Sequence, residues 1–276
     1  MTKSDIVTGL VTDLADEAAS LMGILDPISA EQWALATPAP GWTIHDQVAH
    51  LANFDALTAM AIASPAEFAV FRDNLPDLQE YVDEVGPAHA WQTGAQKLRW
   101  WRAENDALRS AAIKADPAVR VPWFGPAMSL PSKITARIME TWAHGQDVAD
   151  TLGVVREPTQ RLRHVARIGV LAFANSFRAR GRMIPDARVF VELSAPAGDG
   201  GWRWGDEDAP NVVRGDALDF CLVVTQRRHL TDTTLEVRGS VAQEWMSIAQ
   251  AFAGPPGRGR RPGEFAASSS PHSHAG

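Results

Sequence analysis

Apolar residues recur at intervals of three and four along the first half of the chain, which places their side chains on one face of a helix. Over residues 4–25 this face consists of Val7, Leu10, Val11, Leu14, Ala18, Leu21 and Met22. The same periodicity predicts further helices over about 43–63, 88–115 and 132–152. Amphipathic helices joined in series predict a four-helix bundle with its core between facing helices.

Residues that begin and end helices support these ranges. Thr43 precedes Asp46 by three residues, which is the spacing of a capping box at the start of a helix. Gly153 follows the last of these helices, as a C-terminal glycine does. Ser64-Pro65 signals another helix start, and Pro76 interrupts the stretch that follows. We therefore interpret this stretch as an insertion between the second and third bundle helices.

The second half of the chain has a different pattern. A helix is predicted over 158–180, and after Gly181 the apolar residues alternate with polar ones, as in strands. The alternation predicts a hairpin of strands around 189–193 and 202–204. Three further elements are expected: a helix over 218–226, a strand over 234–237 and a helix over 240–253.

These patterns predict an α+β protein with two domains and a tail. The helical bundle is expected over residues 1–155, and a connecting helix with a smaller C-terminal αβ domain over 156–254. Residues 255–276 are rich in Gly, Pro and Arg and then in Ser. We expect this tail, with His272 and His274, to be disordered.

Composition narrows the classes of function. A net charge of −7 on 276 residues argues against nucleic acid as a partner, because binding to a duplex needs a basic surface. No apolar run approaches the ~20 residues that span a bilayer, and no signal peptide is recognisable, so we expect a cytoplasmic protein without a membrane partner. The single cysteine, Cys221, permits neither an internal disulfide nor a thiolate metal cluster. The sequence does not indicate an oligomeric state.

A possible metal site comes from a carboxylate and an imidazole four residues apart. Glu140 and His144 project from one face of a predicted helix. A third ligand must come from a facing helix, and His50 qualifies because the apolar stripe through Phe54 and Leu57 points into the bundle. Two histidines and a glutamate with an open fourth position are typical of catalytic zinc, although other divalent metals accept the same donors. By spacing alone, a solvated Glu–His pair and a core histidine remain alternatives.

Two segments that contain these residues, GWTIHDQVAHL at 41–51 and RIMETWAHGQD at 137–147, resemble a known family. They match the words W-[ST]-x-x-D-x-x-x-H-L and E-x-x-x-H-x-x-D of the mycothiol-dependent maleylpyruvate isomerase family, a branch of the DinB-like four-helix-bundle superfamily. The resemblance implies that His50, Glu140 and His144 are metal ligands and that mycothiol is the thiol cosubstrate. It also implies a smaller, sterol-carrier-like domain in the later part of the chain.

Two residues on the same helix lie close to the expected ligands. Asp147 is one turn beyond His144, where a carboxylate orients a metal-bound imidazole, or else it is an exposed carboxylate. Arg137 is one turn before Glu140 and either pairs with it, faces an anionic substrate or points to solvent. For Arg137 we favour the solvent.

In the C-terminal part, Arg227 follows the predicted helix 218–226, where the family commonly has a Gly-Arg pair that reaches toward the bundle. We assign Arg227 to catalysis, as a guanidinium that captures a carboxylate. Gln226 replaces the glycine and Arg228 follows, so Arg228 remains an alternative for this role.

The other histidines and the cysteine are interpreted as structural. His45 lies on a different side of its helix from His50 and is expected at the surface. His89, His164 and His229 have no metal-binding residue at a suitable spacing on the expected face. Cys221 lies in an apolar run and is expected to be a core residue.

Three functions are compatible with the expected site. The first is a zinc-dependent isomerase or S-transferase that activates a thiol for attack on a small electrophile. The second is a metal-dependent hydrolase that activates water at the same open position. The third is a non-catalytic protein that binds a structural metal and an apolar ligand.

Overall fold

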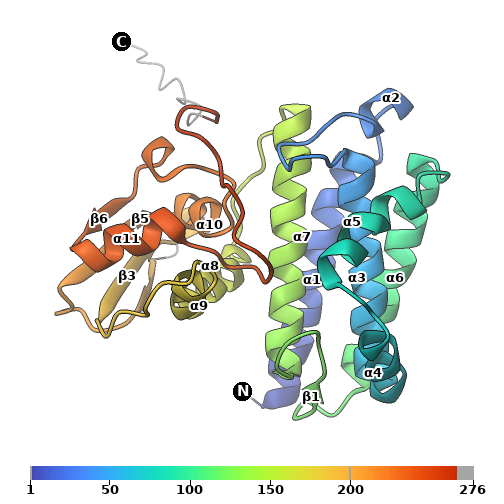
Figure 1. Ribbon diagram of the computed structural model, residues 1–276, viewed down its shortest axis with the longest axis horizontal. Coiled ribbons are helices and arrows are strands. Elements are labelled where there is room, and N and C mark those ends of the chain that lie inside the picture. Colours follow the sequence, from blue (N-terminus) through green and yellow to red (C-terminus); the bar gives the residue numbers. More distant parts are fainter. Residues whose placement is uncertain (1, 199, 266–276) are drawn as a thin grey trace. The chain divides into compact units, whose positions relative to one another are not determined.

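The computed structural model describes residues 2–198 and 200–265 (Figure 1). Its internal contacts divide the chain into two compact units, Met1–Glu157 and Pro158–Gly276. The first unit is helical and the second contains both helices and a sheet, so the α+β fold class is confirmed. No helix among the described residues combines the length and the apolar character needed to span a bilayer.

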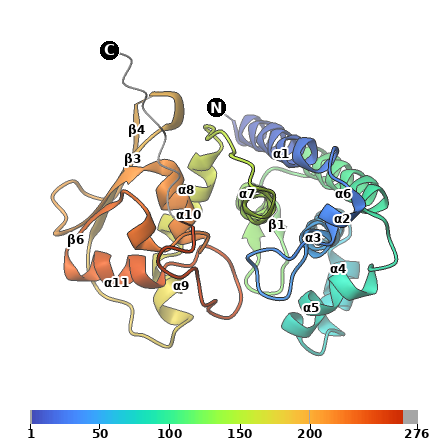
Figure 2. The same cartoon turned by 90° about the horizontal axis from the view of Figure 1, so that it is seen from above.

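A four-helix bundle forms the first unit, from α1 (Lys3–Leu25), α3 (Ile44–Ala63), α6 (Gly94–Lys114) and α7 (Leu130–Leu152). Helix α1 packs against α6 and α7, and α3 packs against the same two helices (Figure 2). The side chains between them are fully buried, and they include Leu14, Leu21, Leu51, Trp101, Leu108 and Ile134. This arrangement places one face each of α3 and α7 toward the interior of the bundle.

The helix ends expected at Thr43 and Gly153 are confirmed. The Thr43 N–H donates to Asp46 Oδ2 at 2.8 Å, and the Asp46 N–H donates to Thr43 Oγ1 at 3.4 Å, which completes the capping box of α3. Gly153 ends α7 with a φ of 66°, a left-handed conformation that glycine adopts easily. The cap fixes the residue at which α3 begins.

Short elements join the bundle helices. They are α2 (Ala30–Trp33), α4 (Pro65–Asp73), α5 (Leu78–Ala88) and the paired strands β1 (Arg120–Val121) and β2 (Met128–Ser129). The expected helix over 88–115 begins later, at Gly94, because Thr93 forms a capping box with Gln96. Trp91, which falls within the expected helix, lies before this start and is 72 % exposed.

The second unit is built on one sheet with the strand order β4-β3-β5-β6. Strands β3 (Val189–Ser194) and β4 (Gly201–Trp204) form the predicted antiparallel hairpin. Strand β5 (Asn211–Asp216) pairs with β3 in parallel and with β6 (Glu236–Arg238) antiparallel. The sequence does not predict β5, because Val212 and Val213 are both buried and the alternation of apolar and polar residues is lost there.

The helices of this unit are shorter than predicted. The expected helix over 158–180 is divided at Ala172 into α8 (Leu162–Leu171) and α9 (Phe173–Arg178). Helix α10 (Ala217–Val224) packs closely on α8, and a Cβ atom on Gly169 would lie only 2.7 Å from Val224 Cγ2. Helix α11 (Ser240–Ile248) ends five residues before the predicted position 253.

The tail was expected to be disordered from residue 255, which is wrong for the part up to Phe265. The Gly263 N–H lies 2.9 Å from both carboxylate oxygens of Asp232 and donates to them. Arg180 Nη2 donates to the Gly257 carbonyl at 3.3 Å. Residues 266–276, which include His272 and His274, lie outside the described residues.

Candidate metal centre

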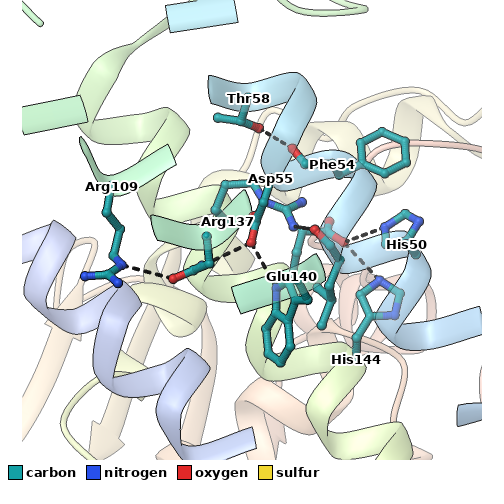
Figure 3. A network of polar contacts seen from close by, with 11 residues as sticks. His50, Phe54, Asp55, Thr58, Arg109, Arg137, Glu140 and His144 are labelled. Atoms are coloured by element: carbon teal, nitrogen blue, oxygen red, sulfur yellow. Dashed lines mark hydrogen bonds and ion pairs between the residues drawn. The ribbon is translucent and has the colours of Figure 1, made fainter. Parts of the chain in front are cut away.

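The bundle brings His50, Glu140 and His144 together from two helices (Figure 3). His50 lies on α3, and Glu140 and His144 lie one turn apart on α7. Each residue contributes one donor atom, and these three atoms lie within 4.8 Å of one another. Glu140 Oε2 is 3.2 Å from His144 Nε2 and 3.8 Å from His50 Nε2. The sequence-predicted ligands therefore converge on one point inside the bundle.

The donor set fits a divalent metal of the zinc type. Zinc lies about 2.0–2.2 Å from nitrogen and oxygen ligands, so tetrahedral neighbours are separated by roughly 3.4 Å. The distances from Glu140 Oε2 to the two imidazole nitrogens, 3.2 and 3.8 Å, bracket this value. Two nitrogens and one carboxylate oxygen also match the preference of zinc for mixed ligands, and three protein donors leave a coordination position open.

The electrostatics of His50 and Glu140 favour the protonation states that bind metal. Burial, followed by the neighbouring charge on His144, lowers the pKa of His50 to about 4, so its imidazole is neutral near pH 7. Burial works against ionisation of Glu140, but the hydrogen bond to His144 and the His50 imidazole 3.8 Å away outweigh it and hold the pKa of this carboxyl well below its ordinary value. Metal binding requires neutral histidine and ionised carboxylate.

Gln47 orients His144, a role that the sequence assigns to Asp147. His144 Nδ1 donates to the Gln47 carboxamide oxygen, and Gln47 Nε2 donates to Thr37 Oγ1 at 2.9 Å. Because an amide oxygen only accepts, Nδ1 carries a proton, and a metal bound at Nε2 would take the place of the proton through which this nitrogen hydrogen-bonds to Glu140. Asp147 is fully buried, so the alternative of an exposed carboxylate is also wrong. The sequence indicates Gln47 only by its position three residues before His50, which places both residues on one face of the helix.

Aromatic rings enclose the two histidines. Trp42 stacks on His144 with a centroid distance of 5.7 Å and an interplanar angle of 13°, and it lies 5.2 Å from His50. The Phe54 ring is 4.4 Å from His50 on the next turn of α3. A cavity of about 100 Å³ adjoins His50, lined also by Trp42, Asp46 and Val82. A small ligand thus has space beside His50.

Arg137 neither pairs with Glu140 nor points to solvent. It is 3 % exposed, and its Nε donates to Asp55 Oδ1 at 2.9 Å (Figure 3). Trp101 Nε1 and Asn105 Nδ2 both donate to Asp55 Oδ2 at 3.0 Å. These residues form a buried ion pair with its own hydrogen-bond network, on the α3 and α7 faces that also carry the trio.

Arg227 lies in the second unit, directly after α10. Its Nη1 donates to the Thr225 carbonyl at 2.6 Å, and Arg228 Nη1 donates to the Arg227 carbonyl at 2.7 Å. Gln226 has a φ of 62°, a left-handed conformation that is uncommon for residues other than glycine. The chain thus adopts at Gln226 the backbone that a glycine favours, which agrees with aligning Arg227 to the arginine of the Gly-Arg pair.

His45 is half-buried, so the expectation of a surface residue is wrong. Its ring lies 5.2 Å from Trp33, and burial, followed by the charge of Lys97, lowers its pKa. His89 is structural, as expected, because its ring contacts the Val85 carbonyl and stacks on Trp100 at 4.4 Å. Cys221 is fully buried, and burial raises the pKa of its thiol well above the ordinary value.

Comparison with known proteins agrees with the site. Residues 14–149 match the family model described as the mycothiol maleylpyruvate isomerase N-terminal domain. This range contains all three metal-binding candidates. Two uncharacterized proteins of Mycobacterium tuberculosis, from strains CDC 1551 / Oshkosh and H37Rv, are each 43 % identical over 251 residues, which cover 91 % of this chain and 97 % of theirs.

Solved structures with a similar fold extend beyond the bundle. The crystal structure of the mycothiol-dependent maleylpyruvate isomerase matches with a TM-score of 0.56 at 16 % identity, over 83 % of this chain and 92 % of that one. A mutant of the same enzyme matches over the same shares with a TM-score of 0.57 at 14 % identity. At these identities the likeness establishes the fold.

Proposed function

Because the chain belongs to the mycothiol maleylpyruvate isomerase family, we propose that it is a metal-dependent enzyme that activates a thiol for attack on a small electrophile. The observation that supports this most directly is the convergence of His50, Glu140 and His144 on one point, with three protein donors. Three donors leave room for one exchangeable ligand. We propose zinc as the metal and mycothiol as the thiol.

A bound zinc ion would supply Lewis-acid chemistry that keeps a thiol in its thiolate form near neutral pH. The residues of the chain prepare the site for this ligand. His50 and Glu140 have the required charge states, and Gln47 holds His144 with Nε2 toward the other donors. Trp42 and Phe54 exclude water from one side of the histidines, which strengthens electrostatic interactions at the site.

Two outcomes of thiolate attack fit the proposal. Reversible addition to an activated double bond gives isomerisation after bond rotation, whereas displacement of a leaving group gives an S-conjugate. Both outcomes need a thiol, and a hydrolase does not. Because the chain belongs to the mycothiol maleylpyruvate isomerase family, we propose an isomerase or S-transferase rather than a hydrolase.

The experiment that tests this proposal combines metal analysis with assays on the purified protein. We expect about one zinc per chain and mycothiol-dependent turnover of either maleylpyruvate, which reports isomerisation, or a chloronitroarene, which reports conjugation. Hydrolysis of an aryl ester without thiol would favour the hydrolase instead. Bound metal without any turnover would favour a non-catalytic binding protein, and absence of metal after incubation with zinc would reject the site.

Gln47→Leu is expected to weaken zinc binding about 10- to 100-fold, because the partner that orients His144 is lost. Competition with a chromophoric chelator measures this. Gln146→Leu is a matched control, since Gln146 is also buried but donates to Asp150 on its own helix at 2.8 Å. Equal zinc affinity of the two variants would contradict the role of Gln47.

Arg227→Ala is expected to raise KM for a carboxylate-bearing electrophile while the zinc content stays unchanged. A charge-assisted hydrogen bond contributes about 1.5–3 kcal/mol, which corresponds to roughly a 10- to 150-fold change. Arg228→Ala is the control, because it removes the neighbouring guanidinium. A larger effect at Arg228 would transfer the proposed role to that residue.

A further inference from the structure

Lys133 is a buried lysine on α7 whose amine has no hydrogen-bond acceptor in the described part of the chain. The residue is 2 % exposed, and its Nζ lies over the indole ring of Trp123, 2.6 Å from the ring centroid. The other buried lysine, Lys97, differs because its Nζ donates to the His89 carbonyl at 3.0 Å. The amine of Lys133 is therefore held by an aromatic ring alone.

Aromatic residues connect this amine to the metal-binding face. The Trp123 ring stacks on Phe68 at 5.4 Å and lies 6.3 Å from Phe54. Phe54 in turn lies 4.4 Å from His50. On α7, Lys133 precedes Glu140 by seven residues, so the two lie on one face of the helix, about 10 Å apart along its axis. The amine thus lies at one end of a cluster of aromatic rings whose other end contacts His50.

The surroundings of Lys133 favour its neutral form. Taking an ammonium out of water costs more free energy than contact with an aromatic face returns. Burial therefore lowers the pKa of Lys133 well below its ordinary value, and the charge of Arg137 one turn away acts in the same direction while Glu140 opposes it. A neutral amine in apolar surroundings carries a free lone pair and is a nucleophile.

We propose that Lys133 is a reactive amine that binds small carbonyl compounds as a reversible imine. In this step Nζ adds to the carbonyl carbon, and a proton moves from nitrogen to oxygen to give a carbinolamine. The hydroxyl group then takes the second proton of Nζ and leaves as water while the C=N bond forms, so no oxidant or reductant is needed. The aromatic residues around Trp123 suit a small apolar substituent on the carbonyl carbon. This activity requires neither metal nor thiol and is independent of the proposed function.

Reductive alkylation tests the proposal on the intact chain, which has only four lysines: Lys3, Lys97, Lys114 and Lys133. The folded protein is incubated at pH 7 with acetaldehyde and sodium cyanoborohydride, which reduces any imine to an ethylamine, and peptide mass spectrometry follows each lysine. An ordinary lysine is neutral in only about one molecule of a few thousand at pH 7. We expect Lys133 to react at least tenfold faster than the exposed Lys3 and Lys114.

Two comparisons make the result decisive. In urea all four lysines should react at similar rates, which shows that the peptide of Lys133 is detected as well as the others. In the folded protein Lys97 should react more slowly than Lys133, because its amine is already hydrogen-bonded. A rate for Lys133 no higher than that of Lys3 or Lys114 would overturn the proposal and identify the residue as a charged structural partner of Trp123.

Discussion

His50→Ala is expected to reduce zinc affinity more than 100-fold and to abolish thiol-dependent turnover. Loss of a residue that only orients a metal ligand already weakens metal binding about 10- to 100-fold. Loss of the ligand itself should therefore weaken metal binding more. The variant keeps Glu140 and His144 on α7, but two donors from one helix leave the metal without its contact to α3. Elemental analysis and the mycothiol-dependent assay measure the two effects.

His45→Ala provides the matched control for this substitution. His45 lies on the same helix five residues earlier, is half-buried and packs near Trp33. It contributes no donor to the trio, so its replacement should leave both zinc content and thiol-dependent turnover unchanged. Wild-type zinc content and activity in His50→Ala would reject the trio as the functional site.

Local sequence signals predicted the bundle helices, and the same signals together with the family resemblance predicted the trio. The capping box of Thr43 and Asp46 determines where α3 starts, and the spacing of Glu140 and His144 determines that both project from one face of α7. His50 was found because the apolar residues that follow it mark the buried face of its helix. Each of these signals lies within one helix, so no knowledge of the packing was needed.

The residues that surround the trio could not be predicted in this way. Gln47 and Asp55 are polar positions on an otherwise apolar helix, and their roles depend on which residues of α7 and α6 face them. Asp147 was a reasonable partner for His144 by spacing, but a residue from the facing helix occupies the imidazole nitrogen. Lys133 was missed for the same reason, since the Trp123 that covers it lies in the loop between β1 and β2.

Asp55→Ala is expected to destabilise the bundle by about 3–5 kcal/mol, because Arg137 would remain as a buried charge without its partner. Asp55 is fully buried and also accepts hydrogen bonds from Trp101 and Asn105, so these donors would lose their acceptor as well. Urea unfolding followed by circular dichroism measures the loss as a shift of the midpoint at constant slope. Because native proteins are stable by only about 5–15 kcal/mol, a loss of this size is a large part of the total.

Two variants separate the effect of burial from the loss of an ion pair as such. The side chain of Asp73 is 65 % exposed and pairs with Arg72. Asp73→Ala breaks this exposed pair and should change stability by less than about 1 kcal/mol. Combining Asp55→Leu with Arg137→Met removes both buried charges and should destabilise less than Asp55→Ala alone, since no uncompensated charge remains.

If Asp55→Ala were no more destabilising than Asp73→Ala, the buried pair would contribute no more than an exposed one, and Arg137 would have to be stabilised by other groups. A double variant less stable than Asp55→Ala would show instead that the hydrogen bonds of Arg137, including its contact with the Leu51 carbonyl at 3.4 Å, stabilise the bundle without Asp55.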